Sequence, residues 1–375
     1  MRILYVTDAF AVWGGMERVL ADKMNYLVGQ YGYEVDLLTV NQGDHSFPFQ
    51  LNDGIGYFDL QIQMHQQYRY HGVRRLLIRR KLKRLLKSRI DKVINEIEPD
   101  IILCVKFDFV GVLYRVKGNI PLIVESHTLY KAEQIDGSGW LRRFHVYSFK
   151  RYIRKVDAIV ALTEGDAADW RKISSRVFVI PNVVHLNDGG RYSSCREKSV
   201  IFVGRFTEQK DLSSLLQIWQ KVHQFHPDWK LEVYGDGELN EQISATNSSI
   251  MIHEPSSNIM EEYEKHSILI LTSLYEPFGL VLPEAMSYGL PVVAFDCPYG
   301  PADIITDGVD GFLIKDRDVE AFADRVCQLI ESEDLRCQMG KQGIVSSQRY
   351  QAERIMPMWN RLFQELTGHT SSPKE

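Results

Sequence analysis

Two glutamates, Glu276 and Glu284, have the type and spacing needed to bind a ligand rich in hydroxyl groups. Glu276 directly precedes Pro277, and Gly279 follows at the start of a helix that we predict over residues 279–288. Proline is favoured at helix starts, where unpaired backbone N–H groups and the helix dipole attract anions and hydroxyl oxygens. Because each carboxylate can accept two hydrogen bonds from neighbouring hydroxyls, the pair predicts contacts to two separate diols.

The alternative for Glu276 is a capped surface helix in which this carboxylate interacts only with the helix dipole. Gly279 favours the ligand-binding interpretation, because a glycine allows a ligand to approach the backbone closely. We therefore expect the backbone N–H groups near Phe278, Gly279 and Leu280 to face the ligand.

A basic pair, Arg205 and Lys210, stands between a predicted strand over residues 199–204 and a predicted helix over 211–225. An arginine can bind a diphosphate as a fork, and a lysine can bind it as a point charge. Two solvated surface cations are the alternative. If the pair binds a diphosphate, its positive charge stabilises the leaving group as the adjoining bond breaks, and no metal ion is required.

The N-terminal half presents two further candidates, a glycine pair and a histidine. Gly14 and Gly15 follow a predicted strand over residues 2–8 and precede a helix, an arrangement that presents backbone N–H groups to phosphate. A tight turn is the alternative. His127 ends a predicted strand over 120–126, at the carboxyl edge where open parallel sheets bind ligands. Its alternative is a hydrogen-bonded structural residue.

These candidates lie on a regular alternation of short apolar strands and amphipathic helices. The predicted strands cover 2–8, 34–40, 101–106, 120–126, 157–162, 177–180, 199–204, 230–235, 249–253, 267–271, 291–295 and 312–314. The predicted helices cover 16–27, 211–225, 258–265, 279–288, 319–331 and 351–368. Such alternation favours parallel sheets that helices cover on both faces. A polar segment near residue 190, HLNDGGRYSS, predicts the boundary between two α/β domains of similar architecture.

The sequence resembles those of family 4 retaining glycosyltransferases of GT-B fold. The spacing Glu276-x7-Glu284, with PFG after the first glutamate and PEAM around the second, resembles the signature of that family. The motif GRF…K ahead of it resembles the family's pyrophosphate-binding pair. The resemblance is strong over about 199–315 and weak over 41–98, where such enzymes recognise their acceptors.

For the fold, the resemblance implies two Rossmann-like α/β domains that face each other across a cleft. Residues 1–190 would form an acceptor-binding domain, and residues 191–352 would form a donor-binding domain for a nucleotide sugar. The last helix, over about 353–375, would cross back to the N-terminal domain.

For the reaction, the resemblance implies transfer of a hexose or N-acetylhexosamine from a nucleotide-diphosphate sugar, with UDP favoured over GDP. It implies retention of anomeric configuration. Because no acid beyond Glu276 is a clear candidate for a nucleophile, we expect a same-face displacement, in which the positive charge at the diphosphate makes a metal or cofactor unnecessary. The donor-binding residues that it implies are Gly14, Gly15, Arg205, Lys210, Met251, His253, Glu276, Phe278, Gly279, Leu280 and Glu284. Those with implied catalytic roles are His127, Glu276, Arg205 and Lys210.

Within this set, the resemblance assigns each part of the donor to its own residues. Glu284 would bind the ribose diol, and Glu276 would bind the hydroxyls of the transferred sugar. His127 would contact that sugar from the other domain, and Met251 and His253 would lie near the base.

Two basic segments indicate where the acceptor resides. Residues 73–87 carry eight basic residues and no acid, and residues 142–155 are also basic. One interpretation is a core-packed helix with a solvated basic face. The apolar positions that recur there at helical spacing are Ile78, Leu82, Leu85, Leu86, Ile90 and Val93. The other interpretation is docking on an anionic membrane surface.

The membrane interpretation predicts a glycan acceptor that is lipid-linked or belongs to a cell-envelope polysaccharide or lipopolysaccharide. It also predicts a cytoplasmic enzyme that attaches peripherally to the inner face of the cytoplasmic membrane. The charge distribution agrees, because residues 1–190 hold 27 basic and 21 acidic residues, whereas the rest of the chain holds 17 and 28.

Bulk composition limits the remaining classes of function. The 375-residue chain is 45% hydrophobic and 25% charged, which favours a soluble protein of two domains. Its net charge of −5 and its lack of a nucleic-acid-binding motif argue against nucleic acid as a partner. No apolar run approaches the roughly 18 residues of a membrane span, and the first residues predict a strand rather than a signal peptide.

Metal and disulfide sites are also disfavoured. Five scattered cysteines without a CxxC pair argue against a disulfide framework or a zinc site. Asp316 and Asp318 form a DxD motif, but its position just ahead of the helix over 319–331 fits a helix cap better than a metal site.

Alternatives to a transferase come from two classes. One is another GT-B activity such as nucleotide-sugar epimerisation, which needs no acceptor. The other is a non-catalytic nucleotide-sugar-binding protein, although the full set of Arg205, Lys210, Glu276 and Glu284 argues against it. A nicotinamide-linked dehydrogenase is disfavoured because a GxGxxG motif followed by a ribose-binding acid is missing.

Overall fold

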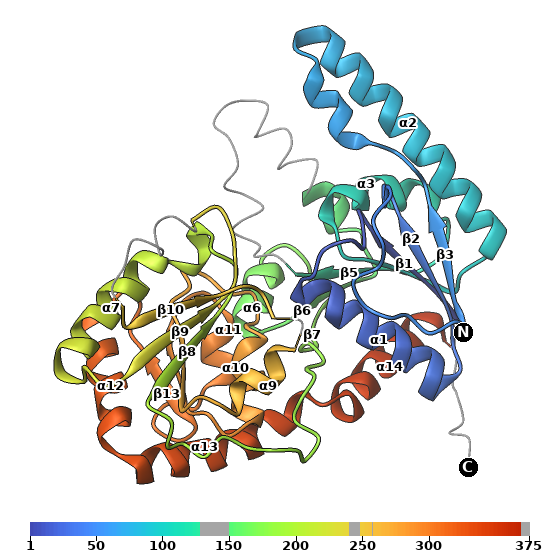
Figure 1. Ribbon diagram of the computed structural model, residues 1–375. Helices are drawn as coiled ribbons and strands as arrows, with labels where there is room; N and C mark the ends of the chain where they lie inside the picture. The colour runs from blue at the N-terminus through green and yellow to red at the C-terminus, as the bar shows by residue number, and fades with distance from the viewer. Residues whose placement is uncertain (128–149, 240–247, 257, 369–375) are drawn as a thin grey trace, which may run out of the picture. The chain divides into compact units, whose positions relative to one another are not determined.

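The computed structural model describes residues 1–127, 150–239, 248–256 and 258–368, and the chain divides into two compact units. Unit 1 consists of Met1–Leu162, Asp166–Val183 and Ala352–Glu375, and unit 2 consists of Thr163–Gly165 and Val184–Gln351. Each unit contains one parallel β-sheet that carries helices (Figure 1). The predicted two-domain α/β class is therefore confirmed.

Unit 1 is built on a seven-stranded sheet in the order β3-β2-β1-β4-β5-β6-β7, in which every pair of neighbours is parallel. Its strands are β1 (Arg2–Thr7), β2 (Glu34–Thr39), β3 (Ile55–Asp59), β4 (Ile101–Cys104), β5 (Leu122–Ser126), β6 (Ala158–Ala161) and β7 (Val177–Val179). Its helices are α1 (Gly15–Tyr31), η1 (Met64–Arg69), α2 (Gly72–Ile97), α3 (Phe107–Val116), α6 (Glu164–Arg171) and α14 (Ala352–Thr367). The strand order changes direction between β1 and β4, where open α/β sheets bind ligands at the carboxyl ends of their strands.

Both faces of this sheet are buried, as the continuous apolar sequence of its strands predicts. In β1, Leu4 and Val6 pack into one hydrophobic cluster, and Ile3 and Tyr5 pack into another. Successive side chains of a strand point to opposite faces, so the two clusters cover the two sides of the sheet. Residues of α2 and α3 complete the first cluster, and residues of α1 and α14 complete the second.

Helix α14, at the end of the chain, packs beside α1 in the second cluster (Figure 1). Met356, Trp359 and Phe363 are buried there together with Leu20 and Met24 of α1. The last helix therefore belongs to the unit formed by the N-terminal half, as the resemblance implies.

Helix α2 confirms the interpretation of a core-packed helix at most of the predicted apolar positions and corrects it at Leu85. Leu86, Ile90 and Val93 are buried in the core, whereas Leu85 is exposed and Ile78 is half-buried. Leu82 also packs against this cluster, so the core receives the helix from about Leu82 onwards.

The first half of α2 extends beyond the sheet that the second half covers (Figure 1). Val73, Leu76 and Leu77 have exposed fractions of 73%, 48% and 58%. These three residues precede Ile78, the first of the predicted core-facing positions, and the sheet does not extend beneath them. Of the second basic segment, residues 142–149 lie outside the residues that the structure describes.

Unit 2 is built on a six-stranded parallel sheet in the order β10-β9-β8-β11-β12-β13. Its strands are β8 (Ser199–Val203), β9 (Lys230–Tyr234), β10 (Ile250–His253), β11 (Ile268–Leu271), β12 (Val292–Phe295) and β13 (Gly311–Ile314). Its helices are η2 (Glu208–Lys210), α7 (Leu212–Phe225), α9 (Ile259–Tyr263), α10 (Val281–Ser287), α11 (Gly300–Ile304), α12 (Val319–Glu331), α13 (Glu333–Ser347) and η3 (Gln348–Tyr350). Here the strand order changes direction between β8 and β11.

Eight of the described elements have no counterpart among the predicted ranges, namely β3, α3, α6, α11, α13 and the short helices η1, η2 and η3. Strand β3 is half-buried along most of its length, so it lacks a continuous apolar run. Helix α11 has five residues, too few to show a helical period, and α13 contains two glycines that disfavour a helix in isolation. Among the described residues, no helix combines the length and the apolar character needed to cross a bilayer.

Candidate functional site

Two loops of unit 2 meet at the carboxyl ends of β8 and β11, the neighbouring strands at which the strand order changes direction. The first loop contains η2, and the second connects β11 to α10. The backbone N–H of Leu274 donates to the Gln209 carbonyl at 2.7 Å, and the Thr272 hydroxyl donates to the Lys210 carbonyl at 2.9 Å. These bonds hold the two loops side by side.

Lys210 and Glu276 form an ion pair between the two loops. The Lys210 Nζ donates to Glu276 Oε2 at 2.5 Å, and the Ser273 hydroxyl donates to the same oxygen at 3.1 Å. The two charged side chains are 12% and 11% exposed, so each charge depends on a protein partner. Within the described residues, no group donates to Oε1, which leaves that oxygen for a ligand hydroxyl.

A neighbouring segment, Pro298 to Gly300, holds the backbone of Glu276. The Glu276 N–H donates to the Pro298 carbonyl at 2.6 Å, and its carbonyl accepts from the N–H groups of Tyr299 and Gly300 at 3.0 and 2.8 Å. A Cβ atom at residue 300 would lie 1.8 Å from the carbonyl oxygen of Phe278. Only a glycine therefore permits this close approach of the two segments.

Gly279 and Glu284 flank the start of α10. Gly279 has a φ of +96°, which favours glycine, and the helix begins at Val281, two residues later than predicted. Glu284 is buried in the first turn and accepts a 3.0 Å hydrogen bond from the Tyr263 hydroxyl of α9. Of the two predicted carboxylates, Glu276 is thus the one that Lys210 contacts.

The remaining predicted donor residues of unit 2 lie on β10 and after β8. Arg205 is exposed, and its side chain makes no hydrogen bond or ion pair with any residue that the structure describes. Met251 is 39% exposed. The His253 ring stacks on the Tyr234 ring at a centroid distance of 4.4 Å, and its Nε2 lies 3.0 Å from a Glu232 oxygen. His253 therefore has structural partners, and its contact with a base stays a prediction.

In unit 1, Gly14 and Gly15 lie where the chain passes from β1 into α1. Gly14 is the N-cap residue of the helix, and Gly15 is the first helical residue. A Cβ atom at residue 14 would lie 2.8 Å from a carboxylate oxygen of Glu17. A phosphate bound at this helix start would therefore lie near the Glu17 carboxylate. That carboxylate already interacts favourably with the helix dipole.

His127 follows β5 and lies beside a buried ion pair. The Lys23 Nζ of α1 lies 2.5 Å from the Glu125 carboxylate, and both side chains are 1% exposed. The His127 Nε2 lies 3.2 Å from the same carboxylate. Burial alone would raise the pKa of Glu125, but the charges of Lys23 and His127 and the hydrogen bonds from Lys23 lower it to about 2. His127 thus has a structural partner at the strand end where a ligand contact was predicted.

Sequence reasoning missed the residues that hold these candidates in place, which are Lys23, Glu125, Asp211, Ser273 and Arg317. One signal was available, because Lys23 and Glu125 are charges at core positions of a helix and a strand, where each requires a partner.

The second aspartate of the DxD motif at 316–318 caps a helix, as predicted. The Asp318 carboxylate accepts from the Ala321 N–H at 3.0 Å, so the predicted cap of α12 is confirmed. In the part of the chain that the structure describes, no group of three or more His, Cys, Asp or Glu residues is arranged to hold a metal ion.

Two family models match the chain in succession. The model described as Glycosyltransferase Family 4 matches residues 13–188, and the model described as Glycosyl transferases group 1 matches residues 193–345. Together the two matches span most of the chain and adjoin near residue 190.

Two relatives match along nearly their whole length. The amylovoran biosynthesis glycosyltransferase AmsD of Erwinia amylovora is 29% identical over 96% of this chain and 98% of its own. The lipopolysaccharide 1,6-galactosyltransferase of Escherichia coli K12 is 27% identical over 89% of this chain and 90% of its own.

A solved structure extends the likeness to three dimensions. It is a point mutant of TarM from S. aureus in complex with fondaparinux, α-GlcNAc-glycerol and UDP. Its TM-score is 0.77 at 16% sequence identity, and the match covers 96% of this chain and 99% of the TarM chain. At this identity the likeness concerns the fold alone.

Proposed function

The chain belongs to the glycosyltransferases of family 4 type and GT-B fold, and we propose that it transfers a hexose or N-acetylhexosamine from a nucleotide-diphosphate sugar to a cell-envelope glycan. The observation that carries this proposal is the ion pair of Lys210 and Glu276 at the carboxyl ends of β8 and β11. UDP is the favoured nucleotide because the similar TarM structure contains it. The names of the E. amylovora and E. coli relatives favour an envelope polysaccharide or lipopolysaccharide as acceptor.

In this proposal Lys210 and the exposed Arg205 bind the diphosphate of the donor. A cation that is largely removed from water stabilises developing negative charge more strongly than one in solvent. Glu276 binds the sugar hydroxyls through Oε1, while Oε2 stays with Lys210 and Ser273. Glu284 binds the ribose diol from α10. We expect the site to require no metal ion, because the two cations offset part of the charge of the leaving group.

The proposed reaction retains anomeric configuration by displacement on one face of the sugar. The bond from the anomeric carbon to the β-phosphate oxygen breaks, and a bond to the acceptor oxygen forms on the same face. The acceptor proton passes to the leaving phosphate. This route is favoured over a carboxylate nucleophile because Glu276 is held by Lys210 through one oxygen and is assigned to the sugar hydroxyls through the other. Asp211 is engaged by Ser214 and Arg317.

Intact-mass spectrometry tests this step. After incubation with a UDP-sugar, we expect the protein to keep its unmodified mass. A hexosyl or N-acetylhexosaminyl adduct that maps to Glu276 would replace same-face displacement with a double displacement.

Thermal shift against UDP, GDP, ADP and their sugars tests the donor class. A ligand that binds only the folded state stabilises it by about 2.7 kcal/mol at roughly 100 times its Kd. We expect UDP and a UDP-sugar to raise the melting temperature, and the same shift to persist with a chelator present. Failure of every nucleoside diphosphate to shift the melting temperature would contradict the proposal, and a loss of the shift with chelator would contradict metal independence.

We also propose that the first half of α2 attaches the enzyme to an anionic membrane. Its exposed apolar residues, Val73, Leu76 and Leu77, stand among exposed arginines. Apolar side chains can enter the headgroup boundary, and each basic residue near the surface contributes about 1 kcal/mol. This surface agrees with an acceptor that is itself part of a membrane.

Co-sedimentation with vesicles of phosphatidylcholine, with and without phosphatidylglycerol, tests the attachment. We expect binding only to the anionic vesicles, a decrease with added salt, and a further decrease in the variant Leu76→Ser/Leu77→Ser. Lys221→Glu, a charge change on α7 of unit 2, is the control and should bind as the wild type does. Sedimentation that is indifferent to lipid charge and salt contradicts the proposal.

A further inference from the structure

Arg317, in the loop between β13 and α12, contacts both loops of the candidate donor site. We propose that Arg317 and Asp211 form a clamp that positions Lys210 against Glu276 for diphosphate binding. This inference rests on the proposed function. Both clamp members are therefore positioning residues, which act on the ligand through Lys210 and Glu276.

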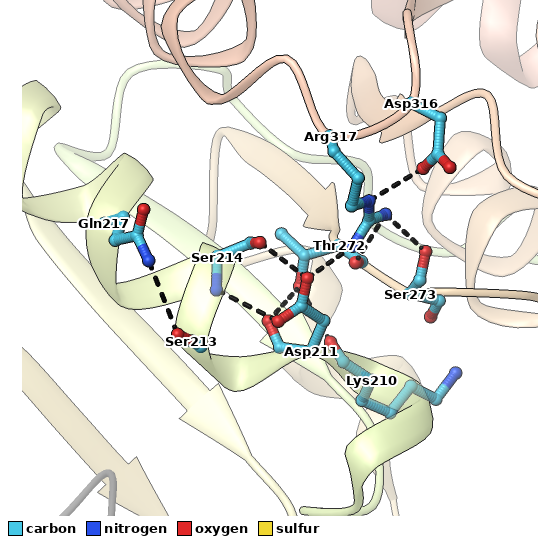
Figure 2. Close-up of polar contacts among 9 residues, drawn as sticks. All are labelled: Lys210, Asp211, Ser213, Ser214, Gln217, Thr272, Ser273, Asp316 and Arg317. Carbon is cyan, nitrogen blue, oxygen red and sulfur yellow. Dashed lines mark hydrogen bonds and ion pairs between the residues drawn. The ribbon is translucent and has the colours of Figure 1, made fainter.

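Figure 2 shows the Arg317 guanidinium between these segments. One of its terminal nitrogens donates to the Asp211 carboxylate. The other donates to the carbonyls of Thr272 at 3.2 Å and Ser273 at 2.8 Å. The Nε donates to Asp316 at 2.7 Å. A single side chain thus joins the loops that follow β8, β11 and β13.

Two partners of Arg317, Asp211 and Ser273, are linked directly to the ion pair. Asp211 directly follows Lys210, and it also caps α7 by accepting from the Ser214 N–H at 3.2 Å. Ser273, whose carbonyl accepts from Arg317, donates its hydroxyl to Glu276. Movement of either segment would therefore change the distance between the Lys210 ammonium and the Glu276 carboxylate.

The backbone of the clamp is unusual for residues that carry a side chain. Arg317 has a φ of +62° and Asp211 has a φ of +47°, both in the left-handed region. Such conformations persist where surrounding contacts enforce them, and they gather at functional sites. The Arg317 guanidinium also lies 4.1 Å from the centroid of the Phe295 ring, which fixes its plane.

The contacts favour a positioning role over direct contact with phosphate. A guanidinium has five N–H donors, and the Arg317 side chain makes four hydrogen bonds within the protein. Only one of its donors is therefore left for a ligand, whereas Lys210 and Glu276 can contact the ligand directly. Arg317 sets the geometry of those two residues.

Two variants at this position separate the clamp from folding. Arg317→Gly removes the guanidinium and also relieves the left-handed backbone, which favours retention of the fold when the clamp is lost. Arg317→Lys keeps a positive charge for Asp211 but has no planar fork to reach two carbonyls at the same time. Arg325→Gln is the matched control, because Arg325 lies in α12 with its guanidinium over Phe312.

Isothermal titration with UDP and with uridine distinguishes positioning from a general structural effect. Uridine lacks the diphosphate, so loss of the clamp should leave its affinity unchanged. We expect Arg317→Gly to lower the affinity for UDP on the order of tenfold, in keeping with one weakened charged hydrogen bond. Arg317→Lys should be intermediate, and Arg325→Gln should match the wild type. Melting temperatures of all variants are measured in parallel.

An unchanged affinity for UDP in Arg317→Gly would overturn the clamp, as would an equal loss of affinity for UDP and uridine. If Arg317→Gly does not fold, Arg317→Lys decides by the same comparison. Failure of the wild-type protein to bind any nucleoside diphosphate would instead contradict the proposed function, and the clamp with it. The two failures are therefore distinguishable.

Discussion

At the residue scale, the proposed chemistry depends on Glu276, whose two oxygens have different surroundings. Glu276→Gln keeps the shape of the side chain but removes the charge that holds Lys210. We expect donor turnover, measured as UDP release, to fall on the order of 10²-fold or more. Glu320→Gln is the control, because Glu320 pairs with Lys221 at the surface of the same unit. Equal rates of UDP release in the two variants would contradict the assignment of Glu276 to the donor site.

Gly300 allows the close approach of the backbone segments beside Glu276. Because a Cβ atom there would lie 1.8 Å from the Phe278 carbonyl oxygen, Gly300→Ala must displace one of two packed segments. We expect it to lower the free energy of unfolding by about 2–3 kcal/mol. The control is Gly29→Ala in α1, where a methyl group meets nothing within 4 Å and should stabilise the helix by about 0.5–1 kcal/mol. Urea denaturation measures both, and a neutral Gly300→Ala contradicts the close approach.

Residue types and their order predicted which side chains could bind a donor, but not which of them touch. Lys210 and Glu276 come from separate motifs, and their contact depends on β8 lying beside β11. Arg317 escaped prediction for a similar reason. Its significance comes from the loops that it joins, and the local sequence shows only a helix cap.

At the element scale, α1, β5 and α14 meet at the buried ion pair of Lys23 and Glu125. The Lys23 ammonium also lies 4.4 Å from the centroid of the Trp359 ring of α14. We expect Lys23→Met to lower the free energy of unfolding by about 3–5 kcal/mol, because it leaves the Glu125 carboxylate buried without its cation. The double variant Lys23→Met/Glu125→Leu should recover most of this loss. A double variant no more stable than the single one would contradict the pairing.

The same pair predicts how stability depends on pH. The pKa of Glu125 is lowered from 4.5 to about 2, because Lys23 and His127 outweigh the opposing effect of burial. A carboxylate with a depressed native pKa contributes stability that is fully present above its unfolded pKa and is lost as the pH falls towards the native pKa. Between about pH 4.5 and pH 2, the wild type should therefore lose stability more steeply than Glu125→Gln. Equal slopes in acid denaturation would contradict this.

Most strands and helices were predictable because apolar runs and helical periodicity record which faces are buried. The exceptions depend on tertiary context. Helix α2 has apolar residues along its whole length, yet Val73, Leu76 and Leu77 near its start are exposed while the later ones pack into the core. Helix α13 contains Gly340 and Gly343, and it forms because it packs against α10 and not because of its propensity.

At the scale of the whole molecule, the repeated alternation of strands and helices sufficed to predict two α/β domains. The return of α14 to unit 1 could not be read from periodicity, because an amphipathic helix does not record which core it joins; the family resemblance supplied it. The acceptor remains the least predictable feature, since the segment over 41–98 resembles the family weakly and contributes the exposed half of α2.

Hydrolysis of the donor tests most directly whether unit 2 activates a nucleotide sugar, because water then replaces the unidentified acceptor. Purified wild-type protein, Lys210→Ala and Lys221→Ala are incubated with a panel of nucleotide sugars, and release of the nucleoside diphosphate is measured. We predict slow release by the wild type and by Lys221→Ala, and a rate lower on the order of 10²-fold or more in Lys210→Ala. Release that is undetectable from every nucleotide sugar, or that is unchanged in Lys210→Ala, would contradict a donor site at Lys210 and Glu276.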